Sequence, residues 1–205
     1  MIYDFNPNQT FLKYKYIMKK IYKTTVDDAS INLLKSVIGF SIDSVRYKGN
    51  YYRYTDVKKD IKYEIVPDEL TYAVIIAFSN HLLQKKLLFE YEAIETDTYQ
   101  DYFSLKIIDI TAEDRPTKIM KTFNDFVVKK IHLFEVHRIL EEEDIIMEGI
   151  ILFIAEPEKR ILIDPNPAGV VFIKIITDSF KINDKINSTN IYKEIYNIQL
   201  VREIQ

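Results

Sequence analysis

The sequence predicts an α+β fold in which a predominantly antiparallel sheet is combined with three to four helices. Short β-branched and aromatic runs, bounded by Pro, Gly, Asn or Asp, are typical of strands. Other segments repeat their apolar residues every three or four positions, which is the period of a helix. The chain has 205 residues, of which 47% are hydrophobic and 29% charged. A chain of this length and composition can bury a substantial core without disulfides or metals.

The strand signal is strongest in residues 145–176. Apolar runs at 150–154, 161–163 and 170–176 are separated by short polar turns. The first two runs do not alternate with polar residues, so we expect both faces of these strands to be covered, in the middle of a sheet. Residues 166–169 have Asn, Pro and Gly where a type I turn prefers them. This part of the chain is therefore predicted to be a core-building meander.

Helical spacing occurs in four segments. These segments are residues 11–22, 26–37, 117–129 and 191–204. In the second segment, Asp27 and Asp28 stand in the first turn, where the helix dipole favours acidic side chains. Gly39 follows as its predicted C-terminal cap. The end of the fourth segment, residues 199–204, also fits an edge strand.

Strand patterns fill much of the remaining chain. They cover residues 41–47, 51–55, 61–66, 70–78, 82–92 and 102–110. Residues 70–78 fit a helix by spacing and a strand by β-branched content, and the following Ser79-Asn80 turn favours the strand. Residues 131–138 either continue the third helix or start a strand.

The predicted elements suggest two α+β lobes, residues 1–114 and 115–205, which pack separately or as one domain. The order helix, strand, hairpin occurs twice. Residues 37–47 can be laid on residues 128–138, which pairs Ile42 with Leu133. This match favours two similar lobes from a degenerate internal duplication.

Composition excludes several kinds of site and segment. The chain has no Cys, which excludes disulfides, thiolate metal ligands and a thiol nucleophile. Its 4 Gly cannot assemble a Gly-rich phosphate loop. The first residues lack the basic lead and apolar run of a signal peptide, and no apolar run approaches the ~20 residues of a membrane helix. We therefore predict a cytoplasmic protein without membrane contact.

Charge is unevenly distributed along the chain. Residues 1–62 hold 12 Lys and Arg against 6 Asp and Glu, which gives +6, and residues 63–205 hold 16 against 25, which gives −9. The lysines of residues 11–22 are interleaved with Tyr14 and Tyr16, as in surfaces that bind nucleic acid. The net charge of −3 disfavours this interpretation, because dedicated nucleic-acid binders carry a basic excess.

No motif in the sequence assembles a catalytic or metal site, and none indicates a cofactor. His132 and His137 stand five residues apart, which in a strand predicts opposite faces. The third histidine, His81, lies beside a turn and is predicted to be exposed. Acidic residues crowd the segment 90–101. An enzyme would require these acids and histidines to converge in three dimensions.

The candidate binding site is a tyrosine-rich hairpin around Lys48-Gly49-Asn50. Its residues are Tyr47, Tyr51, Tyr52, Arg53 and Tyr54. Tyr and Arg are enriched at interface hot spots because they bury a large area and keep a polar tip. The competing interpretation is that these tyrosines cover the core.

The function predicted from the sequence is non-enzymatic binding of another protein. A compact, acidic chain without a motif for catalysis fits an immunity or antitoxin-type inhibitor that masks a toxin. It also fits an adaptor subunit of a bacterial or phage assembly. The alternatives are an enzyme with a metal- or carboxylate-based site assembled only in three dimensions, and a nucleic-acid-associated protein that uses residues 11–22.

Overall fold

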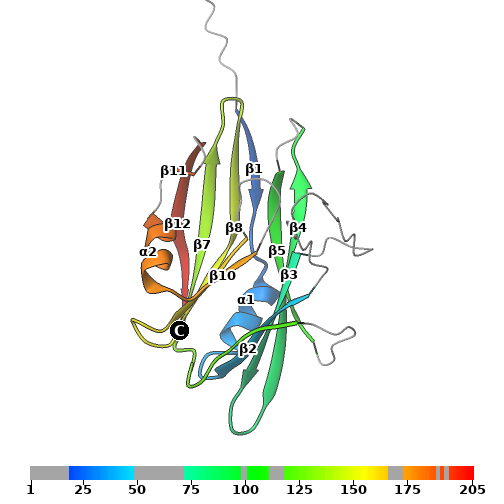
Figure 1. The fold of residues 1–205 in the computed structure, drawn as a ribbon. Helices are drawn as coiled ribbons and strands as arrows, with labels where there is room; N and C mark the ends of the chain where they lie inside the picture. Colours follow the sequence, from blue (N-terminus) through cyan, green and yellow to red (C-terminus); the bar gives the residue numbers. More distant parts are fainter. Residues whose placement is uncertain are drawn as a thin grey trace, which may run out of the picture.

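Two β-sheets packed face to face form the protein (Figure 1). The computed structural model describes residues 19–48, 72–97, 101–110, 118–165, 173–187, 190–191 and 194–205. These residues form twelve strands and two helices. The predicted α+β fold with three to four helices is therefore wrong. The described chain is a β-sandwich, and only its richness in antiparallel sheet was predicted.

The first sheet has five antiparallel strands in the order β5-β4-β3-β2-β6. The strands are β2 (Ser41–Lys48), β3 (Tyr72–Ser79), β4 (Gln84–Glu95), β5 (Asp101–Asp109) and β6 (Lys118–Thr122). The strand predictions for residues 41–47, 70–78, 82–92 and 102–110 are confirmed where the structure describes them, except that residues 82–83 lie in the turn before β4. Those for residues 51–55 and 61–66 lie outside the described residues.

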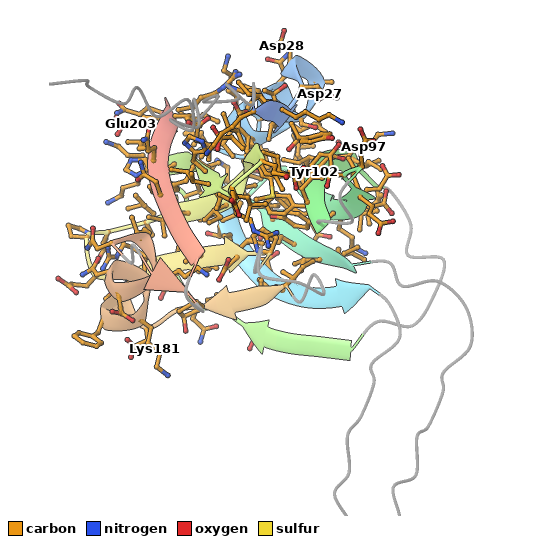
Figure 2. The ribbon with its side chains drawn as sticks, turned by 90° about the horizontal axis from the view of Figure 1, so that it is seen from above. Asp27, Asp28, Asp97, Tyr102, Lys181 and Glu203 are labelled. Carbon is orange, nitrogen blue, oxygen red and sulfur yellow. The ribbon has the colours of Figure 1, made fainter. Side chains whose placement is uncertain are left out.

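The second sheet has seven strands, six of them in the order β10-β9-β8-β7-β12-β11. The strands are β1 (Lys20–Thr24), β7 (Lys130–Ile139), β8 (Glu143–Ile154), β9 (Arg160–Asp164), β10 (Lys174–Ile176), β11 (Asn190–Ile191) and β12 (Glu194–Ile204). The first of these, β1, pairs in parallel with residues 143–147 of β8, whereas β9 pairs with residues 151–154. Helix α2 (Ser179–Asn187) lies at the edge of the molecule, with Lys181 directed outward (Figure 2).

The two sheets share one strand order. In each, four consecutive strands form a meander, and a later strand returns to pair with the first: β6 with β2, and β12 with β7. The matched segments 37–47 and 128–138 lead into or lie on these first strands, β2 and β7. Common descent of the two halves, and the division near residue 115, stay predictions.

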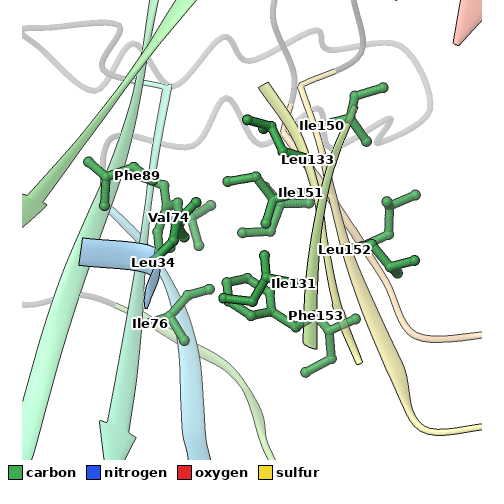
Figure 3. Packing of buried hydrophobic residues seen from close by; sticks show 14 of the residues in the cluster. Leu34, Val74, Ile76, Phe89, Ile131, Leu133, Ile150, Ile151, Leu152 and Phe153 are labelled. Carbon is green, nitrogen blue, oxygen red and sulfur yellow. The ribbon is translucent and has the colours of Figure 1, made fainter. Parts of the chain in front are cut away.

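The core lies between the sheets. Val74, Ile76 and Phe89 face Ile131, Leu133 and Ile151 across it (Figure 3). Ile150 and Leu152 lie on the other side of β8 and are also buried (Figure 3). This burial confirms that β8 is covered on both faces. Strands β8 and β9 also lie in the interior of their sheet, as predicted.

Helix α1 (Asp28–Lys35) confirms the second helical prediction. The Asp27 carboxylate caps it by accepting a hydrogen bond from the Ser30 N–H at 2.7 Å. Gly39 follows with φ +83°, a left-handed conformation that favours glycine. The helix also covers the outer edge of β5, where the Ser30 hydroxyl accepts a hydrogen bond from the Ile107 N–H at 3.0 Å. Side chains thus satisfy part of an edge that would otherwise be open to pairing.

The other helical predictions fail where the structure describes them. Residues 118–122 form β6, residues 194–204 form β12, and residues 20–22 belong to β1, while residues 11–18 lie outside the described residues. Segment 131–138 lies within strand β7. Helix α2 was not predicted.

Strand β12 is irregular. In β12, Ile198, Val201 and Ile204 all pack against the core, which is a spacing of three residues. A bulge between Leu200 and Arg202 leaves Val201 out of the pairing and interrupts the alternation of the strand there. The spacing of apolar residues along the sequence does not by itself distinguish a bulged strand from a helix.

Candidate functional site

The predicted tyrosine surface lies almost entirely outside the described residues. Tyr47 belongs to β2, where its backbone pairs with Val74. Tyr51, Tyr52, Arg53 and Tyr54 fall in the segment 49–71, outside the described ranges. The role of this hairpin in binding stays a prediction.

Within the described residues, the histidines and acids of the predicted enzyme alternative do not converge. His132 lies on β7 between the core residues Ile131 and Leu133, so it points away from the five-stranded sheet. Glu90 lies on β4 between the core residues Phe89 and Tyr91, so it points outward from the opposite sheet. Figure 2 shows the same separation between Glu203, the partner of His132, and Asp97. The sandwich core stands between the two groups.

The prediction that His132 and His137 lie on opposite faces of a strand is wrong. Leu133 and Val136 are both buried, so the alternation of β7 changes phase between them. The register shift at Phe134 and Glu135 marks the place. Both histidines therefore fall on the outward side, separated by the length of half a strand.

His132 takes part in a small surface network. Its Nε2 lies 2.9 Å from the Glu203 carboxylate, which also accepts a hydrogen bond from the Lys130 ammonium at 2.9 Å. The Lys130 hydrogen bond is the main cause of the lowered pKa of Glu203. This arrangement links β7 to β12 as an exposed ion pair. Within the described ranges, no group of three or more His, Asp or Glu could hold a metal ion.

A rigid turn between β3 and β4 presents two leucines to solvent. The Asn80 N–H donates to the Leu83 carbonyl at 2.9 Å. The Asn80 side-chain oxygen in turn accepts from the N–H groups of Leu82 and Leu83, at 2.9 and 2.8 Å. Three hydrogen bonds from one asparagine fix this four-residue loop, as in an Asx turn. We refer to residues 80–83 as the β3–β4 tip.

The leucines of the β3–β4 tip are among the most exposed apolar side chains of the described chain. Leu82 is 80% exposed and Leu83 57% exposed. His81, beside them, is exposed as predicted. Single apolar residues on a surface are common, but two adjacent leucines on a loop held by its own hydrogen bonds are a candidate contact.

The prediction that residues 82–83 start a strand is wrong, because they lie in the turn before β4. One signal of their exposure was present in the sequence, because Leu82 and Leu83 directly follow the turn residues Ser79-Asn80-His81. Residues that belong to such a turn lie beyond the last residue pair of the hairpin. That pair is Ser79 with Gln84, which leaves both leucines outside the sheet. Their exposure follows from the register, which the sequence alone did not define.

Comparisons with protein-family models, with curated proteins and with solved structures find no match to this chain. Neither described helix is long and apolar enough to span a membrane.

Proposed function

We propose that this protein acts by binding another protein and that the β3–β4 tip is a point of contact. The exposed, hydrogen-bonded pair Leu82 and Leu83 is the observation that supports this function. Hairpin strands β3 and β4, paired over eight positions, hold the tip at one end of the sandwich (Figure 1).

Burial and preorganisation both favour binding through the β3–β4 tip. Burying one leucine side chain contributes about 1.5–3 kcal/mol, so the pair supplies a useful anchor. Binding normally costs free energy to order loops and side chains at the interface. The Asn80 hydrogen bonds have already ordered this loop in the free protein, which reduces that cost.

Two kinds of partner fit this proposal. One is a toxin, which the protein would inhibit by covering its active site. The other is a subunit of a larger bacterial or phage assembly, to which the protein would act as an adaptor. The predicted tyrosine hairpin at Tyr47 and residues 51–54 would serve as a second contact in either case.

Quantitative capture from the native cell tests the proposal. The full tagged chain would be compared with a variant carrying Leu82→Ser and Leu83→Ser, and with Phe180→Ser as the matched control. Phe180 is 79% exposed but lies on α2. We expect a stoichiometric partner whose recovery falls roughly tenfold or more with the double variant and is unchanged in the control.

All three proteins should have the same melting temperature, because each replaced side chain is exposed. Equal recovery of the same proteins by all three would contradict a role for the tip. Absence of any stoichiometric partner would contradict the binding function itself.

A further inference from the structure

Most outer edges of the two described sheets carry a feature that discourages pairing with another chain. An open edge offers a row of backbone N–H and C=O groups to any strand, and proteins block it with short strands, lysines, bulges or covering elements. Strands β10 and β11 are three and two residues long. Strands β1 and β6 contain two lysines each, and α1 covers the outer edge of β5.

The outer edge of β12 is the exception among the described strands (Figure 1). Strand β11 occupies this edge only at residues 194–195, and no other described strand pairs with residues 196–204 on that side. Residues 196–200 contain no charged residue, no Pro and no Gly. Leu200, the last of them, is 50% exposed. The bulge at Val201 and two charged residues follow only beyond this stretch.

Helix α2 packs against the same sheet at a distance from this edge. The Lys185 ammonium lies 3.0 Å from the Asp164 carboxylate of β9, and the Arg160 guanidinium donates to the Asn183 side chain at 2.9 Å. Strands β8 and β7 separate β9 from β12. These contacts hold α2 against the face of the sheet, so the helix does not take the place of a strand beside β12.

We propose that a second copy of this chain pairs with the edge of β12, in antiparallel orientation about a two-fold axis at Leu200. In a two-fold interface the same surface comes from both copies, so a residue at the midpoint faces its own counterpart. The open edge runs from residue 196, beside β11, to residue 204, and its midpoint is residue 200. Only this register pairs the whole edge with itself and avoids β11. Self-pairing at β12 is independent of the β3–β4 tip.

The side chains along β12 are compatible with this register. Leu200 meets Leu200 of the second copy, which removes two half-exposed apolar side chains from water. Arg202 falls opposite Ile198, and Glu203 falls opposite Asn197. No two like charges are therefore directly opposed, although directly opposed like charges would destabilise the pair.

The bulge at Val201 lies beside the midpoint and divides the contact into two arms. In each arm, residues 196–198 of one copy pair with residues 202–204 of the other. The two-fold axis generates both arms together, so the bulge interrupts the pairing without removing it. A strand from an unrelated protein would form similar backbone hydrogen bonds, but it would not require Leu200 to face Leu200. This difference allows a direct test.

Charge replacement at the midpoint tests the proposal on the full chain. In sedimentation velocity, the wild type should change from monomer to dimer between low micromolar and near-millimolar concentration. Leu200→Lys and Leu200→Glu should each weaken the dimer roughly tenfold or more, because each variant opposes two like charges. An equimolar mixture of the two variants should dimerise again. Ile21→Lys is the matched control, since Ile21 is 68% exposed but lies on β1, and it should dimerise like the wild type.

An engineered disulfide provides a second measurement that leaves the strand uncharged. The chain has no Cys, so Leu200→Cys carries a single thiol. Directly opposed residues of paired strands have Cβ atoms roughly 5 Å apart, close to the separation that a disulfide spans. Mild oxidation should therefore link two copies of Leu200→Cys far faster than two copies of Ile21→Cys. Melting temperatures of all variants establish that the fold is retained.

The outcomes separate self-pairing from its alternatives. A wild type that stays monomeric over the whole concentration range would overturn the proposal. A dimer that survives Leu200→Lys, or that Ile21→Lys also abolishes, would be formed through another surface. If the mixture of Lys and Glu variants stays monomeric, or the two thiols crosslink at equal rates, Leu200 does not face its own counterpart. None of these results bears on the β3–β4 tip, which the capture experiment tests separately.

Discussion

At Gly149 the two sheets lie so close together that a side chain would overlap the opposite sheet. A Cβ atom at this position would stand 2.7 Å from Cε2 of Phe103, and the backbone has φ +157°. The Tyr91 hydroxyl crosses from the opposite sheet and donates to the Gly149 carbonyl at 2.7 Å. Burial raises the pKa of Tyr91 well above its usual value, so this hydroxyl remains a donor. Glycine thus permits both the close contact and the hydrogen bond.

The change Gly149→Ala should therefore lower the free energy of unfolding by about 3 kcal/mol, through overpacking and backbone strain together. Gly39→Ala is the control, since Gly39 has a left-handed φ but no atom within 4 Å of its Cβ position. Only the backbone strain applies there, with a cost of about 1–2 kcal/mol. Urea unfolding measures both. Equal losses in the two variants would show that the sheets do not meet at Gly149 as described.

At the scale of elements, the stability of α1 depends on its N-terminal cap, Asp27. Hydrogen bonding from the Ser30 N–H, the largest cause, lowers the pKa of this carboxylate below its usual value. The helix carries Ser30, which binds the edge of β5, and Ile31 and Leu34, which enter the core. Loss of the cap should therefore also weaken the contacts that α1 makes with β5 and with the core.

Replacement of this cap by Asp27→Ala should cost about 1 kcal/mol at neutral pH. Because the folded-state pKa of Asp27 is lowered, its charge contributes stability above the unfolded-state pKa. That contribution is lost as the pH falls through the folded-state pKa, below about pH 4. Urea titrations of wild type and Asp27→Asn, an uncharged cap, measure the difference. A difference that does not shrink in acid would contradict the assignment.

Sequence patterns identified elements better than they identified the fold. Strands β2, β3, β4 and β5 and helix α1 were predicted because their signals are local: alternation, turn residues and caps. The fold class failed because β12 and residues 118–129 imitate helical spacing. In the second case Phe123 and Phe126 pack edge to face across an irregular segment, in which Asp125 has φ 58°.

The candidate site was harder to predict than the strands that carry it. A turn after Ser79-Asn80 was expected, and so was the exposure of His81. The exposure of Leu82 and Leu83 depends on which residues form the last pair of the hairpin, and that register is a tertiary property. The separation of His132 from the acids of β4 likewise required knowledge of which strands share a sheet.

At the scale of the whole molecule, a sandwich with one shared core holds two sheets of the same strand order. Such a scaffold keeps the end that carries the β3–β4 tip rigid, because strands β3 and β4 lie inside the five-stranded sheet. The central claim is that this end meets a partner protein.

Site-specific photo-crosslinking in the native cell tests that claim most directly. A photoreactive amino acid in place of His81 leaves Leu82 and Leu83 intact beside it, and the same group in place of Lys181 on α2 is the control. We expect a covalent adduct with one protein from position 81 and none from position 181. An adduct from both positions, or from neither, would contradict it.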